Sequence, residues 1–232
     1  IIVSVWDEGW NTNYFAVEWL NEEGCNYNFE ISGKIATPDG KYLKDVEVEL
    51  EENLVKKFKT TTDKFGSYAL FGEPDRDYVV HAAIEDGDYL NGVSTLDVVY
   101  VQRHILGLEA FSDPYKWLAA DVNNDKNITA SDLVEMRKLI LGVKYSFTNS
   151  SWRFPIKNQA FVIPNLFPYI ERYKYEELAG SKVNQDFVAI KIGDVNYTAS
   201  VDLKSKDTEI RTPKSMEIKV QSGSYKKDDI IS

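Results

Sequence analysis

A repeated pattern in the middle of the chain most constrains how it can fold. Residues 93–107 recur at 128–142, and in both copies a hydroxyl residue stands three positions before an aspartate and the pattern ends in Ile-Leu-Gly. These hydroxyl, aspartate and glycine residues are Ser94, Asp97 and Gly107 in the first copy and Thr129, Asp132 and Gly142 in the second. A hydroxyl residue three positions before an aspartate is typical of a helix N-terminus. Glycine is typical of the left-handed residue that follows the end of a helix. The repeat therefore predicts two helices with defined ends.

Each of these helices has apolar residues on one face. They are Val98, Val101, Ile105 and Leu108 in the first helix and Leu133, Met136, Ile140 and Val143 in the second. Helices this short are not stable alone in water, so we expect the two apolar faces to pack against each other. A short third helix is predicted to begin at Asp113-Pro114, where an N-cap aspartate precedes a proline in the first helical position.

The residues before the second helix have the spacing of a calcium loop. Counted from Asp121, oxygen-bearing side chains stand at positions 1, 3, 5, 9 and 12, position 7 offers a backbone carbonyl, and position 8 is the apolar Ile128. The candidate ligands are Asp121, Asn123, Asp125, Asn127, Thr129 and Asp132. Calcium takes six or more oxygen ligands, whereas zinc prefers cysteine or histidine. Two departures from the common EF-hand loop are Asp132 in place of glutamate and Lys126 in place of glycine.

A weaker version of this loop precedes the first helix. If it ends at Asp97 it begins at Asp86, and its candidate ligands are Asp86, Asp88, Asn91, Gly92, Ser94 and Asp97. Position 5 is Leu90, which cannot bind a metal, so Asn91 either replaces it or serves as a left-handed residue at position 6. The alternative for both loops is a solvated turn with helix-capping residues. The segment 194–196 resembles the start of a third loop, but its position 12 would be Ser205, and we interpret it as a turn.

Two such loops, each followed by one helix ending in Ile-Leu-Gly, resemble a type I dockerin, and aspartate at position 12 is usual in that family. Residues 91–97 and 102–107 in particular resemble the dockerin-type module of very long bacterial surface proteins. The resemblance implies calcium as the cofactor and a secreted, extracellular or cell-surface location. It implies no reaction.

Residues 29–85 have the pattern of a small β-sandwich. Strands are expected at 31–35, 46–50, 68–71 and 78–84, with turns at 37–40 and 63–66. Val46, Val48 and Leu50 alternate with Glu47 and Glu49, which predicts one buried face and one face exposed to water. The turn Pro-Asp-Gly at 38–40 and the segment 60–68 resemble the carboxypeptidase-regulatory-like, or collagen-adhesin B-type, sandwich. That resemblance implies an Ig-like fold and is silent on activity.

The sequence as a whole predicts a multidomain, mainly β chain with a small α module: an Ig-like β-sandwich, a two-helix dockerin-like calcium module and an irregular β region. The expected segments are 1–28 (C-terminal strands of a preceding β-domain), 29–85 (sandwich), 86–147 (calcium-binding repeat), 148–199 (β extension) and 200–232 (start of a following β-domain). Short connections without Gly/Ser- or Pro-rich linkers lead us to expect that residues 29–199 form one compact unit.

Composition excludes several function classes. The net charge of −10 and the absence of a basic stripe argue against binding to nucleic acid or anionic lipid, and no apolar run is long enough to span a membrane. Catalysis is not expected, because no nucleophile, histidine and acid can be combined and there is no Gly-rich phosphate loop. Cys25 is the single cysteine, so it is either a free thiol or bonded to a partner outside this chain.

We therefore expect a non-catalytic, calcium-stabilised structural or adhesive segment of a large secreted bacterial surface protein, whose partners are the neighbouring domains of the same chain. One alternative is a dockerin that binds a cohesin-like partner and tethers an enzyme; its recognition pairs would be Thr95-Leu96 and Ala130-Ser131, which differ between the two halves. Another is a carbohydrate-binding module that contacts a surface glycan through tryptophans. The candidate tryptophans are Trp6, Trp10, Trp19, Trp117 and Trp152.

Overall fold

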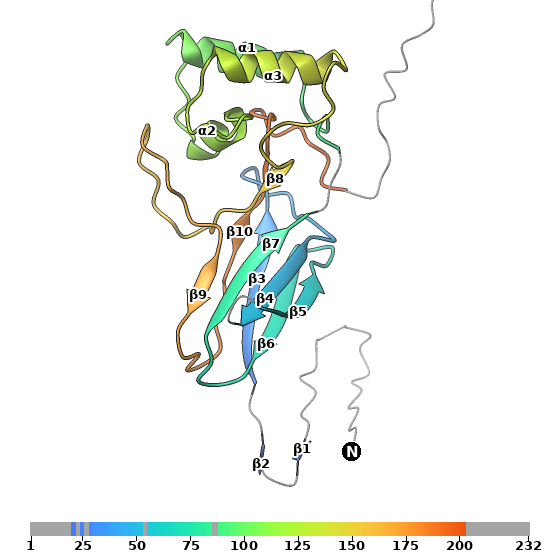
Figure 1. Ribbon diagram of the computed structural model, residues 1–232, viewed down its shortest axis with the longest axis vertical. Helices are drawn as coiled ribbons and strands as arrows, with labels where there is room; N and C mark the ends of the chain where they lie inside the picture. Colours follow the sequence, from blue (N-terminus) through green and yellow to red (C-terminus); the bar gives the residue numbers. More distant parts are fainter. Residues whose placement is uncertain (1–19, 22–23, 26–27, 53–54, 85–87, 203–232) are drawn as a thin grey trace, which may run out of the picture.

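The computed structural model describes residues 20–21, 24–25, 28–52, 55–84 and 88–202. Most of the strands expected in residues 1–28, and all but the first three residues of the β-domain expected to start in 200–232, lie outside these residues. Within the described residues, β1 pairs with β2, and strands β3–β7 follow (Figure 1). Three helices and the short strands β8–β11 come after them. The strands are β1 (Leu20–Asn21), β2 (Gly24–Cys25), β3 (Phe29–Ala36), β4 (Glu47–Glu52), β5 (Val55–Thr61), β6 (Ser67–Gly72), β7 (Tyr78–Ala83), β8 (Trp152–Arg153), β9 (Tyr173–Tyr175), β10 (Phe187–Val188) and β11 (Ile190–Lys191). The helices are α1 (Thr95–Ile105), α2 (Pro114–Ala120) and α3 (Ala130–Ile140).

Two sheets pack face to face and form what we call the β-unit. One sheet has the order β10-β3-β6 and the other β5-β4-β7-β9. Their facing side chains share one core, in which Ile31 and Ile35 from the first sheet meet Val48, Leu50 and Val80 from the second, all fully buried. The strands expected from residues 29–85 are therefore present, and β9 and β10 extend the two sheets with residues from the far end of the chain.

The outer face of β4 differs from the expectation. Glu49 was expected to face water, but it is only 1 % exposed, and Glu51 is also buried. The cause lies in the neighbouring strands, because Glu49 stands directly opposite Lys59 of β5 and His81 of β7. The side chains of Lys59 and His81 cover the Glu49 carboxylate from both sides. The glutamates that alternate along β4 therefore belong to a cluster of ion pairs across the strands.

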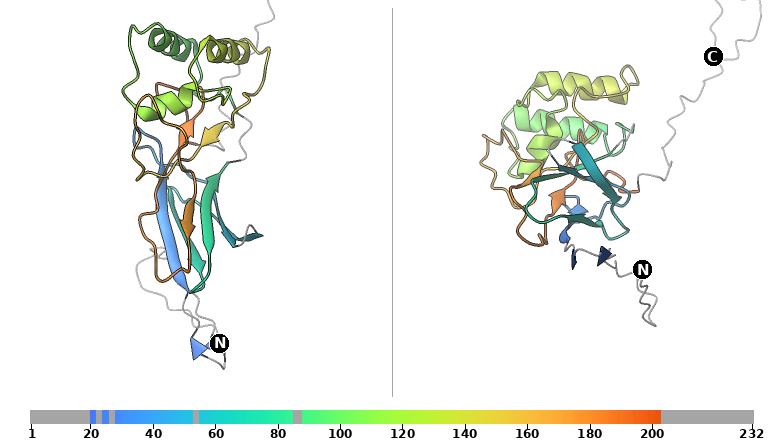
Figure 2. Two further views of the ribbon diagram at one scale, coloured as in Figure 1. Left: turned by 60° about the vertical axis from the view of Figure 1, so that its left-hand side comes forward. Right: turned by 60° about the horizontal axis from the view of Figure 1, so that its bottom comes forward.

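The three helices form what we call the helical unit. Helices α1 and α3 lie side by side, and α2 lies between them and the strands (Figures 1 and 2). Asp113 caps α2 by accepting a hydrogen bond from Tyr115 N, with Pro114 in the first turn, as expected. Gly107 and Gly142 follow α1 and α3 with left-handed φ values of 67° and 68°. The expected helix ends are thus confirmed.

The apolar faces of α1 and α3 are buried only as far as each helix extends. Val101 and Met136 are fully buried in the core of the helical unit. Leu108 and Val143 were placed on the same faces, but they lie after the left-handed glycines and are 70 % and 71 % exposed. The glycine ends the helical periodicity, so the next apolar residue no longer shares the face.

A bridging segment, residues 187–195, joins the two units. Phe187 and Ala189 lie in the core of the β-unit, whereas Val188, Ile190 and Ile192 lie in the core of the helical unit. This follows from strand geometry, because successive side chains of an extended chain point to opposite sides. β10 pairs parallel with β3, and β11 pairs antiparallel with β8. One short segment therefore forms part of both cores.

The rest of the region 148–199 is irregular, as expected. Outside the bridging segment, its regular structure consists of β8, β9 and isolated bridges such as the one between Val162 and Asn165. Trp152 is buried in the core of the β-unit. No helix in the described part of the chain is long and apolar enough to cross a membrane.

Candidate metal centre

The loop expected to bind calcium connects α2 to α3. Asp121 directly follows the last residue of α2, and Thr129 is the N-cap of α3. All six candidate ligands of this loop are therefore brought to one end of the two helices. They are Asp121, Asn123, Asp125, Asn127, Thr129 and Asp132.

The buried end of the loop is organised by Asp121, which is 2 % exposed. Its Oδ1 accepts a hydrogen bond from Asp125 N (3.0 Å) and its Oδ2 accepts one from Lys126 N (3.0 Å). The chain can fold back in this way because Asn124 and Lys126 adopt left-handed backbone conformations, with φ values of 61° and 70°. Lys126 thus takes the conformation that glycine has in the common calcium loop.

Asp132 closes the loop from the first turn of α3 and is fully buried. Its Oδ1 accepts hydrogen bonds from Val122 N (3.1 Å) and Asn123 N (3.4 Å), and its Oδ2 accepts one from Thr129 N (2.9 Å). The last bond is half of a capping box. The two ends of the loop are therefore held together by one carboxylate.

The electrostatics of the loop favour a cation. The pKa of Asp121 is raised to about 6, chiefly by burial and also by the nearby Asp132 and Asp125 carboxylates, against the opposing effect of the hydrogen bonds from Lys126 N and Asp125 N. Burial also raises the pKa of Asp132. Carboxylates held together away from water gain most when a bound cation replaces the protons.

The donor set fits calcium. Asn123, Asp125 and Asn127 supply further oxygens beside the two buried carboxylates, and Asp125 Oδ1 already orders the turn by accepting from Asn127 N (2.8 Å). The loop contains no cysteine or histidine, so hard oxygen coordination is the chemistry that it offers. A cation enclosed by such a set stabilises structure.

The residues proposed for the first loop do not all come together. Asp86 lies outside the described residues. Asp88 is exposed, and its Oδ1 accepts from Leu90 N and Asn91 N as a local turn cap. Asn91 pairs with Ser200, donating to its backbone oxygen (2.9 Å) and accepting from its backbone nitrogen (2.8 Å).

The later part of the first loop does form a site-like arrangement. Asp97 is fully buried, and its Oδ2 accepts from Ser94 N (2.9 Å) and Ser94 Oγ (2.7 Å). Its Oδ1 accepts from Val195 N (3.0 Å), which lies in the bridging segment. Gly92 has a left-handed φ of 75°. The sequence pattern did not indicate that residues around Asp194 would reach this loop.

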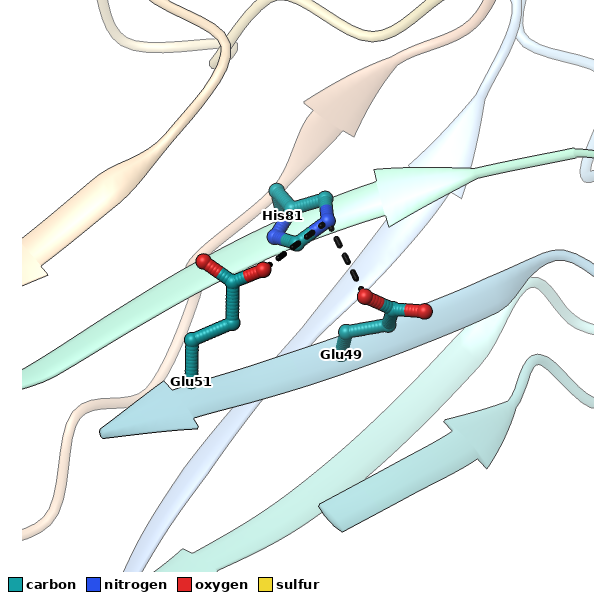
Figure 3. Close-up of side chains that lie close together, drawn as sticks. All are labelled: Glu49, Glu51 and His81. Carbon is teal, nitrogen blue, oxygen red and sulfur yellow. Dashed lines mark ion pairs between the residues drawn. The ribbon is translucent and has the colours of Figure 1, made fainter. Parts of the chain in front are cut away.

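A second cluster of possible metal ligands lies on the outer face of the β-unit (Figure 3). His81 Nε2 lies 3.2 Å from Glu49 Oε2 and 3.9 Å from Glu51 Oε1. Lys59 Nζ lies 3.1 Å from Glu49 Oε1, and Arg172 Nη1 lies 3.2 Å from Glu51 Oε2. The two carboxylates are thus matched by cations from neighbouring strands, and we assign the cluster to the stability of the sheet.

Comparison with protein families identifies the loop-and-helix region. Residues 87–141 match the family model of the dockerin type I domain. The matched residues include α1, α2, α3 and the loop from Asp121 to Asp132, so the dockerin resemblance is supported for this part of the chain. Calcium binding is a general property of dockerin type I domains. Comparison with curated proteins and with solved structures finds no match.

Proposed function

We propose that this chain is a non-catalytic structural segment in which calcium stabilises a dockerin-type helical unit that is built rigidly onto a β-unit. The observation that carries the proposal is the bridging segment, since Phe187 and Val188 are adjacent in sequence but buried in different cores. Two units that share one extended segment cannot separate without exposing both cores. Such a segment suits a stiff link in a longer secreted or cell-surface protein.

Polar contacts support the same conclusion at the metal centre. Asn149, just before β8, donates from Nδ2 to Asp121 O (2.9 Å), and its backbone nitrogen donates to Val122 O (3.2 Å). Lys191 of β11 is only 4 % exposed, and its Nζ donates to Ser151 Oγ (2.9 Å). Asn149 therefore ties the start of the calcium loop to the segment that leads into β8, and a bound ion would stiffen this joint between the units.

We further propose that residues 29–85 have the carboxypeptidase-regulatory-like fold, which the antiparallel pairing of β3 with β6 and of β4 with β5 and β7 supports. We propose no reaction for the segment. The loop oxygens surround a closed site, and calcium held in this way supports a fold instead of activating a substrate.

The experiment that tests the proposed function is calcium removal. The thermal unfolding midpoint should rise when calcium is added to the chelator-treated chain, because only the folded state offers the assembled ligands. Limited proteolysis of the calcium-free chain should cut first between about residues 86 and 132 and leave the β-unit as a fragment. No thermal shift, together with no heat of calcium binding in calorimetry, would refute the proposal.

A second candidate function is docking to a cohesin-like partner. Helices α1 and α3 expose Leu96 (49 %), Val99 (48 %) and Val134 (45 %), and apolar side chains of this kind are what a protein partner covers. Calcium-dependent binding to an immobilised cohesin domain, lost in Leu96→Glu and kept in the control Leu90→Glu, would support it. The glycan alternative has less support, because Trp152 is buried and Trp117 donates its ring N–H to Phe111 O, while Trp6, Trp10 and Trp19 lie outside the described residues.

A further inference from the structure

The segment that begins at Asp194 repeats the opening of the calcium loop. Asp121 Oδ1 and Oδ2 accept from the backbone nitrogens four and five residues later, and so do the oxygens of Asp194. In the second case the donors are Thr198 N (3.2 Å) and Ala199 N (2.7 Å). The residue three positions after each aspartate is left-handed, with φ values of 61° at Asn124 and 63° at Tyr197. Residues 194–199 therefore reproduce positions 1–6 of the loop.

The closing aspartates are related in the same way. Asp132 Oδ1 accepts from Val122 N (3.1 Å), the nitrogen that follows Asp121. Asp97 Oδ1 accepts from Val195 N (3.0 Å), the nitrogen that follows Asp194, although the two residues are 98 positions apart. Residues 92–97 therefore supply positions 7–12, and residues 194–199 take the place that residues 86–91 would have in a continuous loop.

The two half-loops meet where a continuous chain would pass from position 6 to position 7. A Cβ atom at Gly92 would lie 2.7 Å from both Ala199 N and Ala199 Cα, so only glycine permits this approach. Thr198 Oγ1 donates to Gly92 O (3.2 Å), and Asn91 forms its paired hydrogen bonds with the backbone of Ser200 at the same junction.

One buried oxygen in the junction has no partner among the residues that the structure describes. Asn196 occupies the place that Asn123 has in the continuous loop, and its Oδ1 is buried without a hydrogen-bond partner. A buried oxygen without a partner is costly unless a ligand satisfies it. Asn196 lies two residues after Asp194, and the carboxylates of Asp194 and Asp97 are 2 % and 0 % exposed. A cation at this junction would give the Asn196 oxygen the partner that it lacks among the described residues.

We propose that residues 194–199 and 92–97 together form a composite calcium loop, in which Asp194, Asn196, Ser94 and Asp97 supply side-chain oxygens and Gly92 supplies a backbone oxygen. The site has two carboxylates, whereas the continuous loop has three, so it binds calcium more weakly. This inference rests on the calcium binding of the proposed function, and it replaces Asp86 and Asp88 as ligands of the first site.

The test is calcium titration of the full chain by calorimetry, with NMR signals of the Val195 and Gly92 amides recorded in parallel. We expect two ions per chain, with the Val195 and Gly92 signals moving during the weaker binding step. Asn196→Ala should weaken that step at least tenfold, and Asn196→Asp, which adds a third carboxylate, should strengthen it. Asp88→Ala is the matched control and should change neither step.

Each other outcome is decisive. One bound ion that moves only the signals of residues 121–132 overturns the composite loop and leaves the proposed function intact. Weakening by Asp88→Ala but not by Asn196→Ala overturns it in favour of a continuous first loop. Binding of no calcium at all refutes the proposed function as well.

Discussion

Phe187 and Val188 are neighbours in the chain but are buried in different cores: Phe187 contacts the β-unit and Val188 contacts the helical unit. Both are at most 6 % exposed, although they belong to a strand of only two residues. Although β10 is the edge strand of its sheet, its two side chains make it a wall that both cores share.

Shortening the Phe187 side chain of β10 should destabilise the β-unit and the helical unit together. Phe187→Ala removes a fully buried ring that packs against Tyr68 and Tyr173, and we expect a loss of about 3–5 kcal/mol in the free energy of unfolding. The helical unit should unfold in the same transition, which would be seen as coincident denaturation curves from tryptophan fluorescence and from calcium release. As a control, Phe65→Ala, which removes an exposed ring of a turn, should have little effect. Two separated transitions in Phe187→Ala would contradict the shared wall.

The continuous calcium loop should depend strongly on its closing carboxylate. Asp132→Asn keeps the size of the side chain but removes a charge from the buried end of the loop, so we expect calcium affinity at this loop to fall at least tenfold. Calorimetry measures the change. Glu109→Gln makes the same charge change at an exposed residue outside the loops and should leave the affinity unaltered. Equal effects of the two variants would show that only overall charge matters.

Lys126 offers a way to separate backbone strain from charge. Its left-handed backbone is unfavourable for a residue with a side chain, by about 1–2 kcal/mol, whereas glycine accepts it. Lys126→Gly and Lys126→Ala both remove a positive charge near the cation, so both should bind calcium more tightly. Thermal unfolding of the calcium-free chain should show that the glycine variant is more stable than the alanine variant. The reverse order would mean that this backbone carries no strain.

His104 should make the chain sensitive to mild acid. Burial lowers the pKa of His104 below its usual value of 6.5, and its Nδ1 accepts a hydrogen bond from Phe111 N (3.0 Å), which only the uncharged acceptor form allows. The unfolded chain therefore takes up this proton first, and the stability present above pH 6.5 decreases as the pH falls towards the lower folded pKa. Proton NMR of the two histidines measures the titration directly.

The matched control for this prediction is His104→Gln, which lacks the titrating group and leaves the residues 92–97, 121–132 and 194–199 unchanged. The decrease in stability between pH 6.5 and pH 5 should be smaller in this variant than in the parent chain. A His104 signal that titrates at or above pH 6.5 would contradict the prediction.

Local patterns allowed much of this structure to be predicted. The helix ends at Ser94, Asp113 and Thr129 follow from capping chemistry within a few residues, and the patterns in 29–85 predicted strands β3, β4, β6 and β7 of the β-unit. The burial of Glu49 was missed, because it depends on Lys59 and His81 from neighbouring strands. Leu108 and Val143 were misplaced because helical periodicity was extended beyond the glycine that ends each helix.

In the candidate site, too, features set by neighbouring residues could be predicted and features set by distant segments could not. The loop from Asp121 to Asp132 is continuous in sequence, so its spacing could be recognised. The approach of Val195 to Asp97 depends on how distant segments pack, and no local pattern reports that. One signal did exist: the tripeptide Asp-Val-Asn occurs at 121–123 and again at 194–196.

The position of the bridging segment late in the chain has a consequence for the order of folding. Strands β4, β5 and β7 can pair as soon as they leave the ribosome or a secretion channel, because their partners are close in sequence. The helices cannot complete their core until Ile190 and Ile192 have emerged, and β3 must wait as long for its parallel partner β10. A chain stopped before residue 187 would therefore present bare helices and an open strand edge, so residues 187–192 decide whether the segments made before them stay folded.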